Sequence, residues 1–114
     1  MPVSDKYINY VQDLLQDFAP LRVKRMFGGA GVYSGNLFFA IIADDELYLK
    51  VDHQNRTDYE AQGLQPFTYM MKGGKTATMS YYPLPADVLE DTDGLRDWVR
   101  KALAAAHRAK HKTS

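Results

Sequence analysis

Hydrophobic residues recur at helical spacing in two segments, one at each end of the chain. The first runs from Ser4, a favourable N-cap, to Pro20, and the second runs from about residue 92 towards Ala109. Stripes of this kind predict two amphipathic helices that each pack one face against a core. The stripe residues are Tyr7, Val11, Leu14, Leu15 and Phe18 in the first segment and Leu95, Trp98, Val99, Ala102, Leu103 and Ala106 in the second.

Between these helices, short runs of branched and aromatic residues predict β-strands. The first four runs are joined by turns such as Ser34-Gly35-Asn36 and Asp44-Asp45, and connections this short force antiparallel pairing. A short helix at residues 54–63, capped by Gly63, precedes the last two strands. The predicted strands cover residues 23–27, 32–33, 37–42, 47–51, 67–71 and 76–82.

The resulting order of elements is helix, three to four strands, helix, two strands, helix. It predicts an α+β fold, a two-layer domain whose antiparallel sheet of five to six strands carries helices mainly on one face. A chain of 114 residues has the usual length of one domain. We therefore expect a single domain over residues 1–114, with a frayed tail at residues 107–114.

The composition argues against several classes of protein. The chain has 14 basic and 14 acidic residues, whereas dedicated nucleic-acid or membrane binders usually carry a basic excess. It has no cysteine, which excludes disulfides and thiolate metal sites. Its N-terminus does not resemble a signal peptide, and no apolar run approaches the roughly 18 residues of a membrane span. These features predict a cytoplasmic protein that does not act at a membrane.

Glycines between Arg25 and Ile42 raise the question of a nucleotide site. In a dinucleotide-binding fingerprint that starts at Gly29, Ser34 stands where the third glycine belongs, and a strand follows where a helix is required. Gly74-Lys75-Thr76 resembles the end of a Walker A loop, but Tyr69 occupies the position of that loop's first glycine. Neither pattern therefore predicts a phosphate site.

We interpret these glycines as structural residues at a bend between the first two strands, where positive φ or close backbone approach is needed. At least one of four glycines should have positive φ, and the aromatic residues on either side of the bend should be at least partly buried. The glycines are Gly28, Gly29, Gly31 and Gly35, and the aromatic residues are Phe27 and Tyr33.

Other candidate chemistry is sparse. His107 and His111 are four residues apart on the last helix, but the glutamate of the zinc-protease pattern is absent and two cations lie between them. His53 has no serine or acid partner that the sequence identifies, and residues 44–46 form an acidic turn that needs solvent. We therefore expect no enzymatic activity, no metal site and no cofactor.

Basic residues gather in two segments that could form a surface for an anionic partner. The last helix and its tail, residues 96–114, carry six basic residues and one acidic residue. An alternative interpretation is that cations near a helix C-terminus complement the helix dipole and keep the tail soluble. The residues of the candidate surface are Arg22, Lys24, Arg25, Arg96, Arg100 and Lys101.

The stretch "RMFGGAGVYSGNLFFAIIADDELYLKVD" resembles the signature region of the TfoX/Sxy N-terminal domain family. The similarity continues through "MSYYPLP" at residues 79–85 into the last helix with Trp98, so it covers nearly the whole chain. The structural signature comprises Met26, Phe27, Gly28, Gly29, Gly31 and Tyr33, and further matching residues are Val32, Phe38, Ala40, Leu47, Tyr48, Leu49 and Lys50.

This resemblance implies a two-layer antiparallel α+β domain and no established catalytic residues. Named members of the family are bacterial regulators of natural competence that act with the cyclic-AMP receptor protein and carry a second, helical domain. Because this chain ends at Ser114, we expect it to lack that second domain. The resemblance implies a non-catalytic domain that binds a protein partner, such as a component of the transcription machinery.

Two alternatives stay open at this point. One is a small-ligand or enzymatic site near the bend at Gly28 to Gly31, where glycines allow close approach to the backbone. The other is direct DNA binding through the basic last helix. A homodimer is compatible with each of these hypotheses.

Overall fold

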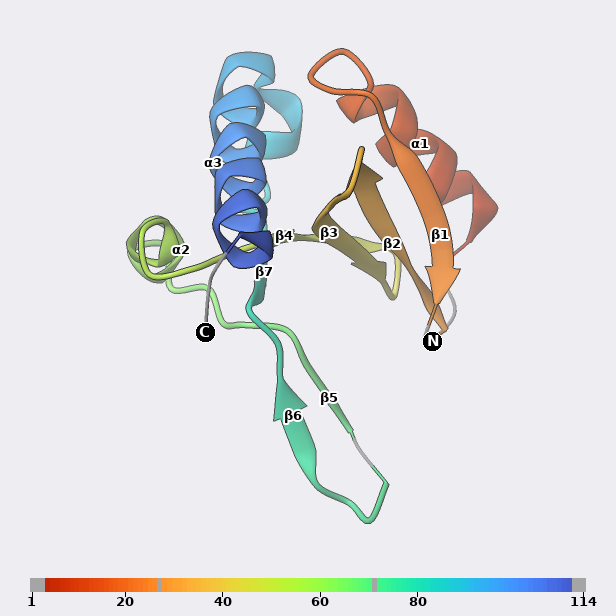
Figure 1. The fold of residues 1–114 in the computed structure, drawn as a ribbon, viewed down its shortest axis with the longest axis vertical. Helices are drawn as coiled ribbons and strands as arrows, with labels where there is room; N and C mark the ends of the chain where they lie inside the picture. Colours follow the sequence, from red (N-terminus) through yellow and green to blue (C-terminus); the bar gives the residue numbers. More distant parts are fainter. Residues whose placement is uncertain (1–3, 27, 71, 112–114) are drawn as a thin grey trace.

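A computed structural model describes residues 4–26, 28–70 and 72–111 (Figure 1). The order of elements is that predicted from the hydrophobic pattern, with an additional short 3-10 helix before the last helix. The elements are α1 (Asp5–Leu15), β1 (Arg22–Met26), β2 (Gly29–Ser34), β3 (Leu37–Ala43), β4 (Glu46–Lys50), α2 (Arg56–Glu60), β5 (Thr68–Met70), β6 (Thr76–Thr78), β7 (Tyr81–Pro83), η1 (Val88–Glu90) and α3 (Thr92–Lys110).

The main sheet has five antiparallel strands in the order β1-β2-β3-β4-β7, which confirms the predicted α+β fold. The expected last strand at residues 76–82 is divided in two. Its first part, β6, pairs with β5 in a separate hairpin that projects from the body of the domain (Figure 1). Its second part, β7, pairs with β4. Where the two parts meet, the backbone N–H of Phe67 donates to the backbone oxygen of Tyr81.

One face of the sheet forms the core with the helices. Alternate residues of β2, β3 and β4 on this inner face are fully or almost fully buried, and both α1 and α3 lie over it (Figure 1). The helices contribute the apolar stripes that the sequence predicts, and six of the eleven stripe residues are buried while the other five are partly buried against the core. The inner-face residues are Ala30, Val32, Ala40, Ile42, Leu47 and Leu49, and they cluster with Val11, Leu15, Leu95, Val99, Ala102 and Ala106 of the helices.

Most of the described residues with positive φ lie in turns between strands. Gly28 has a φ of 75° between β1 and β2, and Gly35 has a φ of 59° between β2 and β3, which confirms the prediction for the four glycines. Asp44 and Asp45 also have positive φ in the turn between β3 and β4. The Asp45 carboxylate accepts a hydrogen bond of 2.9 Å from the backbone N–H of Ser4, so this turn holds the start of α1.

Two details differ from the prediction, the end of α1 and the burial of Trp98. Helix α1 ends at Leu15 and not at the proline, whereas α3 ends at Lys110, next to the expected end at Ala109. Trp98 is only half-buried and packs edge-on against Tyr59 of α2, with ring centroids 4.7 Å apart, while Leu95 and Val99 fill the core. Among the described residues, no helix has the length and apolarity needed to cross a membrane.

Candidate functional site

The outer face of the sheet, opposite α1 and α3, carries an aromatic row that crosses the strands. Side chains on this face alternate with those of the core, because the side-chain period of a strand is two residues. Tyr33 on β2 stacks on Phe38 of β3 with ring centroids 4.9 Å apart, and Phe38 contacts Tyr81 of β7 at 5.5 Å. The row therefore joins strands that are far apart in the sequence.

A cation closes each end of this row. The guanidinium carbon of Arg22 lies 4.8 Å from the centre of the Tyr33 ring, and Lys50 Nζ lies 5.1 Å from the centre of the Tyr81 ring. Burial raises the pKa of the Tyr81 hydroxyl and lowers the pKa of the Lys50 ammonium group. Contacts between aromatic rings and between a ring and a cation over its face are both favourable. The row is therefore an ordered part of the surface.

Beside this row, the β5–β6 hairpin and the outer face enclose an apolar cavity of about 290 Å³. Methionine and phenylalanine side chains from both parts line it, and Met70 of the hairpin is 72% exposed. No ionisable side chain lines this cavity in the part of the chain that the structure describes. The lining residues are Met26, Gly29, Phe38, Ile41, Ile42, Ala43, Phe67, Met70 and Met79.

Two of the signature glycines, Gly29 and Gly31, shape this cavity through close packing and not through positive φ. A Cβ atom on Gly31 would lie 2.8 Å from Met26 Cε and 2.9 Å from Phe38 Cε1, so Gly31 lets these two lining residues approach each other. A Cβ atom on Gly29 would lie 2.4 Å from the backbone oxygen of Ile42. Both glycines belong to β2 itself, and the bend lies before them, next to Gly28.

The predicted partial burial of the two aromatic residues that flank the bend can be checked for one of them. Tyr33 is half-buried in the aromatic row, which confirms the expectation of partial burial. Phe27 lies outside the described residues. Met26 is half-buried and lines the cavity, so the signature positions that the structure describes are placed at the outer face or the turn beside it.

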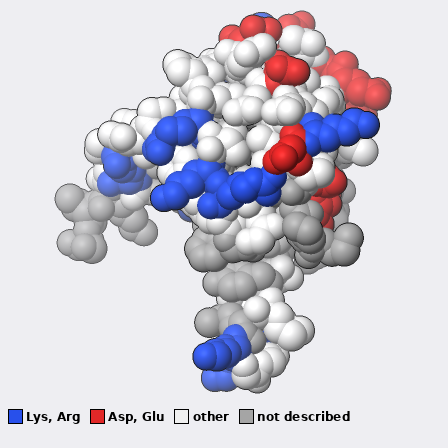
Figure 2. Space-filling model, turned by 90° about the vertical axis from the view of Figure 1, so that its right-hand side faces the viewer, with Lys and Arg blue, Asp and Glu red and all other residues white. Residues whose placement is uncertain are grey.

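The three candidate cations of β1 lie at the edge of the sheet. Arg22 and Lys24 share the outer face, because they pair with Tyr33 and Gly31 in the register of β1 and β2. Arg25 forms an ion pair with Asp5 of α1. Figure 2, which views the side where α1 and β1 lie, shows Lys and Arg in a band across this side and again at the tip of the hairpin.

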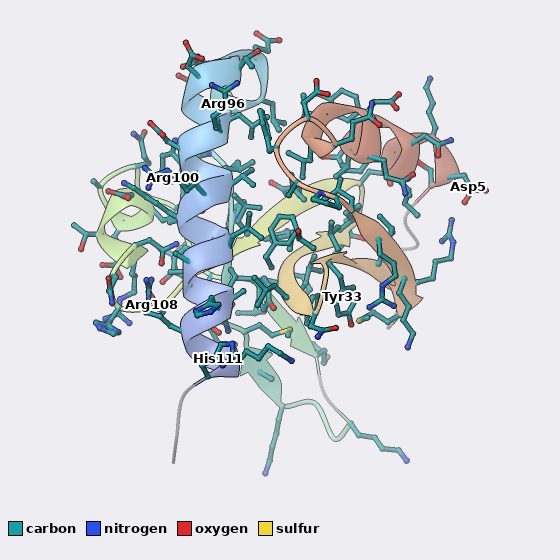
Figure 3. All side chains as sticks on the ribbon, turned by 45° about the horizontal axis from the view of Figure 1, so that its top comes forward. Asp5, Tyr33, Arg96, Arg100, Arg108 and His111 are labelled. Carbon is teal, nitrogen blue, oxygen red and sulfur yellow. The ribbon has the colours of Figure 1, made fainter. Side chains whose placement is uncertain are left out.

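The three candidate cations of α3 have carboxylate partners of their own. Arg96 and Arg100 pair with the acids three residues before them at 3.6 Å and 3.5 Å, and Lys101 contacts Asp58 near α2 at 2.9 Å. Figure 3 shows Arg100 and Asp5 at opposite sides of the domain. The two predicted groups of cations therefore have different carboxylate partners, although Arg96 also lies over the ring of Phe18, just after α1, with its guanidinium carbon 5.6 Å from the ring centre.

Near the C-terminal end of α3, a second cavity contains residues that the sequence analysis considered separately. Arg108 Nε and Nη2 donate to the Asp52 carboxylate at 2.6 Å and 2.9 Å, and His53, His107 and His111 line the same cavity. The sequence gives no signal for this arrangement, because these residues are separated by more than fifty positions. Among the described residues, no three histidine or carboxylate side chains are arranged so that they could hold a metal ion.

The ion pair between Asp52 and Arg108 should make stability depend on pH. The hydrogen bonds from Arg108 are the largest cause that lowers the pKa of Asp52, to about 2, against about 3.9 for an unfolded chain. Because the folded-state pKa is the lower one, the stabilisation is present above the unfolded value and is lost as pH falls towards 2. We expect the advantage of wild type over Asp52→Asn to be about 1–2 kcal/mol at about pH 6, since solvent screens the partly exposed pair, and to become small near pH 2, where the folded-state carboxyl is half protonated.

Urea denaturation of both proteins across this pH range measures that difference. Asparagine retains a side-chain oxygen for the backbone N–H of Gln54, which donates to Asp52 at 2.9 Å in the wild type. The substitution therefore removes the charge and the oxygen that accepts from Arg108 Nε, while it keeps the contact with Gln54. A difference in the free energy of unfolding that stays constant from about pH 6 to pH 2 would contradict the assigned ion pair.

Comparison with known proteins agrees with the fold and the position of the signature. No curated protein sequence matches the chain at a significant level. The model of the family described as the TfoX N-terminal domain matches residues 13–106, which include the whole main sheet and most of α3. The chain therefore belongs to the TfoX N-terminal domain family.

Proposed function

We propose that this chain is a non-catalytic regulatory domain that binds a protein partner on the outer face of its sheet. Membership of the TfoX N-terminal domain family supports a role similar to that of competence and transcription regulators. The observation that carries the proposal is the apolar cavity between the outer face and the β5–β6 hairpin. An apolar surface of this kind on a small domain is typical of an interaction site.

The chemistry of the cavity favours an apolar segment of a partner that also carries acidic residues. Met26, Met70 and Met79 contribute flexible and polarisable side chains, which adapt to the shape of a bound segment. Arg22 and Lys24 lie on the same face at the edge strand, where they would complement carboxylates that flank the apolar residues. The partner segment would thus combine one or two large apolar residues with neighbouring acids.

A selection experiment tests this proposal without a known partner. A random peptide library is panned against the immobilised full-length chain, and the affinity of enriched peptides is measured by fluorescence anisotropy. We expect enriched peptides to combine apolar and acidic residues. Met70→Glu should weaken their binding at least about tenfold, because it places a negative charge at the mouth of the cavity.

Tyr10→Glu provides the matched control. Tyr10 and Met70 are the large hydrophobic residues that the structure describes as exposed, and Tyr10 lies on α1, on the other side of the sheet. Peptides that bind Met70→Glu as tightly as wild type would refute the proposed surface. A failure to enrich any peptide would refute a peptide-binding function for the cavity.

The structure gives a second candidate function a specific basis. The hypothesis of a ligand site near the bend is supported by this cavity, because Gly29 lines it. Its volume of about 290 Å³ is close to the lower limit of about 300 Å³ for ligand pockets. Its apolar lining favours a small hydrophobic molecule over a polar substrate. Saturable binding of such a compound that Met79→Glu abolishes, together with an absence of peptide binding, would favour this alternative.

A further inference from the structure

The second cavity, at the C-terminal end of α3, has a volume of about 630 Å³ and a different chemistry. It lies between α3, the segment after β4 and the residue before β7, and Figure 3 shows Arg108 and His111 at this end of the helix. The chain has three histidines, and all of them line this cavity. The complete lining is Lys50, Val51, Asp52, His53, Ser80, His107, Arg108, Ala109 and His111.

The fixed charges in this lining give a positive balance. Lys50 and Arg108 are cationic, and Asp52, the carboxylate of the lining, is paired with Arg108. Both oxygens of Asp52 accept from Arg108, which uses two of the five N–H groups of its guanidinium. Further donors of Arg108 thus remain for a ligand, while the Asp52 carboxylate fixes the orientation of the guanidinium plane.

Lys50 is the second oriented cation. Its Nζ donates to Ser80 Oγ at 2.8 Å and lies over the Tyr81 ring, which leaves two further N–H groups of the ammonium. Burial lowers the pKa of this ammonium group, and a bound anion would remove that effect. A partly buried cation held by two contacts is ready to bind an anion with little loss of side-chain entropy.

The imidazole rings provide the third component of the site. The rings of His107 and His111 lie one helical turn apart, with centroids separated by 4.3 Å, and His53 lines the cavity from the segment after β4. When it is protonated, an imidazole ring donates from both of its nitrogens. With protonated imidazoles the cavity presents several donors to an anion, and the flat rings can stack on a planar organic group.

We propose that this cavity binds a small phosphorylated molecule, with its phosphate held by Lys50 and Arg108 and its organic part beside the imidazole rings. A phosphate dianion fits two cations and several imidazole donors better than a carboxylate, which carries one charge and fewer acceptor oxygens. The volume is well above that of a phosphate group alone and within the usual range of about 300–1,000 Å³ for ligand pockets. This site does not depend on the proposed protein-binding function of the outer face.

The histidines supply a direct readout of binding. Because all three line the cavity, the imidazole ring signals in the NMR spectrum of the full-length chain report only on this site. Phenyl phosphate is the probe, since it combines a phosphate with a flat ring. A bound dianion stabilises the imidazolium form, so we expect the pKa of at least two of the imidazoles to rise by about 0.5 unit or more at millimolar phenyl phosphate.

Variants and a second probe make the test specific. Lys50→Met keeps the length of the side chain and should weaken phenyl phosphate binding at least about tenfold. His53→Gln alters an exposed lining residue, so it should weaken binding a few-fold without unfolding the protein. Lys101→Met, on α3 but outside the cavity, is the matched control and should bind as wild type does.

Three results would overturn the proposal. The first is the absence of any change in the imidazole titrations at millimolar phenyl phosphate. The second is binding that neither Lys50→Met nor His53→Gln weakens, which would place the anion elsewhere. The third is an equal response to benzoate at the same concentration, which would show that the cavity does not select phosphate over carboxylate.

Discussion

Phe39→Ala should destabilise the domain by about 3–5 kcal/mol, which is a large part of the roughly 5–15 kcal/mol that stabilises a typical small domain. Phe39 lies on the central strand β3, is fully buried and is among the largest side chains of the core. Alanine in its place would leave a cavity between the sheet and the helices. Urea denaturation monitored by circular dichroism measures the loss of unfolding free energy.

Tyr10→Ala is the control for this substitution, because Tyr10 is 45% exposed on α1. Its removal should change the unfolding free energy by no more than about 0.5–1 kcal/mol. A loss below about 1 kcal/mol for Phe39→Ala would mean that the core is not packed as described.

The position of Phe39 also explains how two adjacent phenylalanines of β3 contribute to different faces of the sheet. Val32 pairs with Ala40 and Tyr33 pairs with Phe38, so the register shifts and Phe39 is the extra residue of a β-bulge. The two adjacent phenylalanines then have separate roles. Phe39 fills the core, and Phe38 joins the aromatic row and lines the apolar cavity.

The hydrophobic pattern was sufficient to predict most of the fold. Each long helix buries one stripe, and short turns such as Ser34-Gly35-Asn36 force neighbouring strands to pair, so these elements depend on local sequence. The division of residues 76–82 between two sheets does not depend on local sequence. It follows from the pairing of β7 with β4, a contact between segments about thirty residues apart.

The candidate sites were harder to predict, because each depends on distant pairs. The aromatic row requires the register that places Tyr33 beside Phe38 and brings Tyr81 next to them. The second cavity requires α3 to end beside the segment after β4, where Arg108 meets Asp52. The sequence analysis considered the pair His107 and His111 separately from His53 and therefore could not identify this cavity.

Trp98 also illustrates that periodicity does not predict contacts between distant segments. Its place on the apolar stripe predicts a core position, and it does pack against the core cluster. Its closest aromatic neighbour is Tyr59 of α2, whose position the periodicity of α3 cannot indicate. The surroundings of a residue at the margin of a stripe thus depend on tertiary contacts. Periodicity correctly predicts the burial of Leu95 and Val99 at the centre of the stripe.

Two of the signature positions require glycine for different reasons, one for its backbone conformation and one for lack of space. Substitutions can distinguish the two reasons. At Gly28 the φ of 75° disfavours a side chain, but an added Cβ would meet no atom within 4 Å. At Gly29 the φ is not in the positive range, but an added Cβ would lie 2.4 Å from the backbone oxygen of Ile42 on the neighbouring strand. Conformational strain applies at the first position and steric exclusion at the second.

Gly29→Ala should therefore destabilise the domain by about 2–3 kcal/mol, because a backbone oxygen in the centre of the sheet cannot move as a flexible side chain can. Gly28→Ala should cost only about 1–2 kcal/mol, the usual penalty for a non-glycine residue with left-handed angles. Denaturation of the two variants in parallel measures both losses. Gly29→Ala should also disturb the apolar cavity, which Gly29 lines, while Gly28→Ala should leave peptide binding at the outer face unchanged. A larger loss of stability for Gly28→Ala than for Gly29→Ala would contradict the close approach of β2 and β3, on which the shape of the cavity depends.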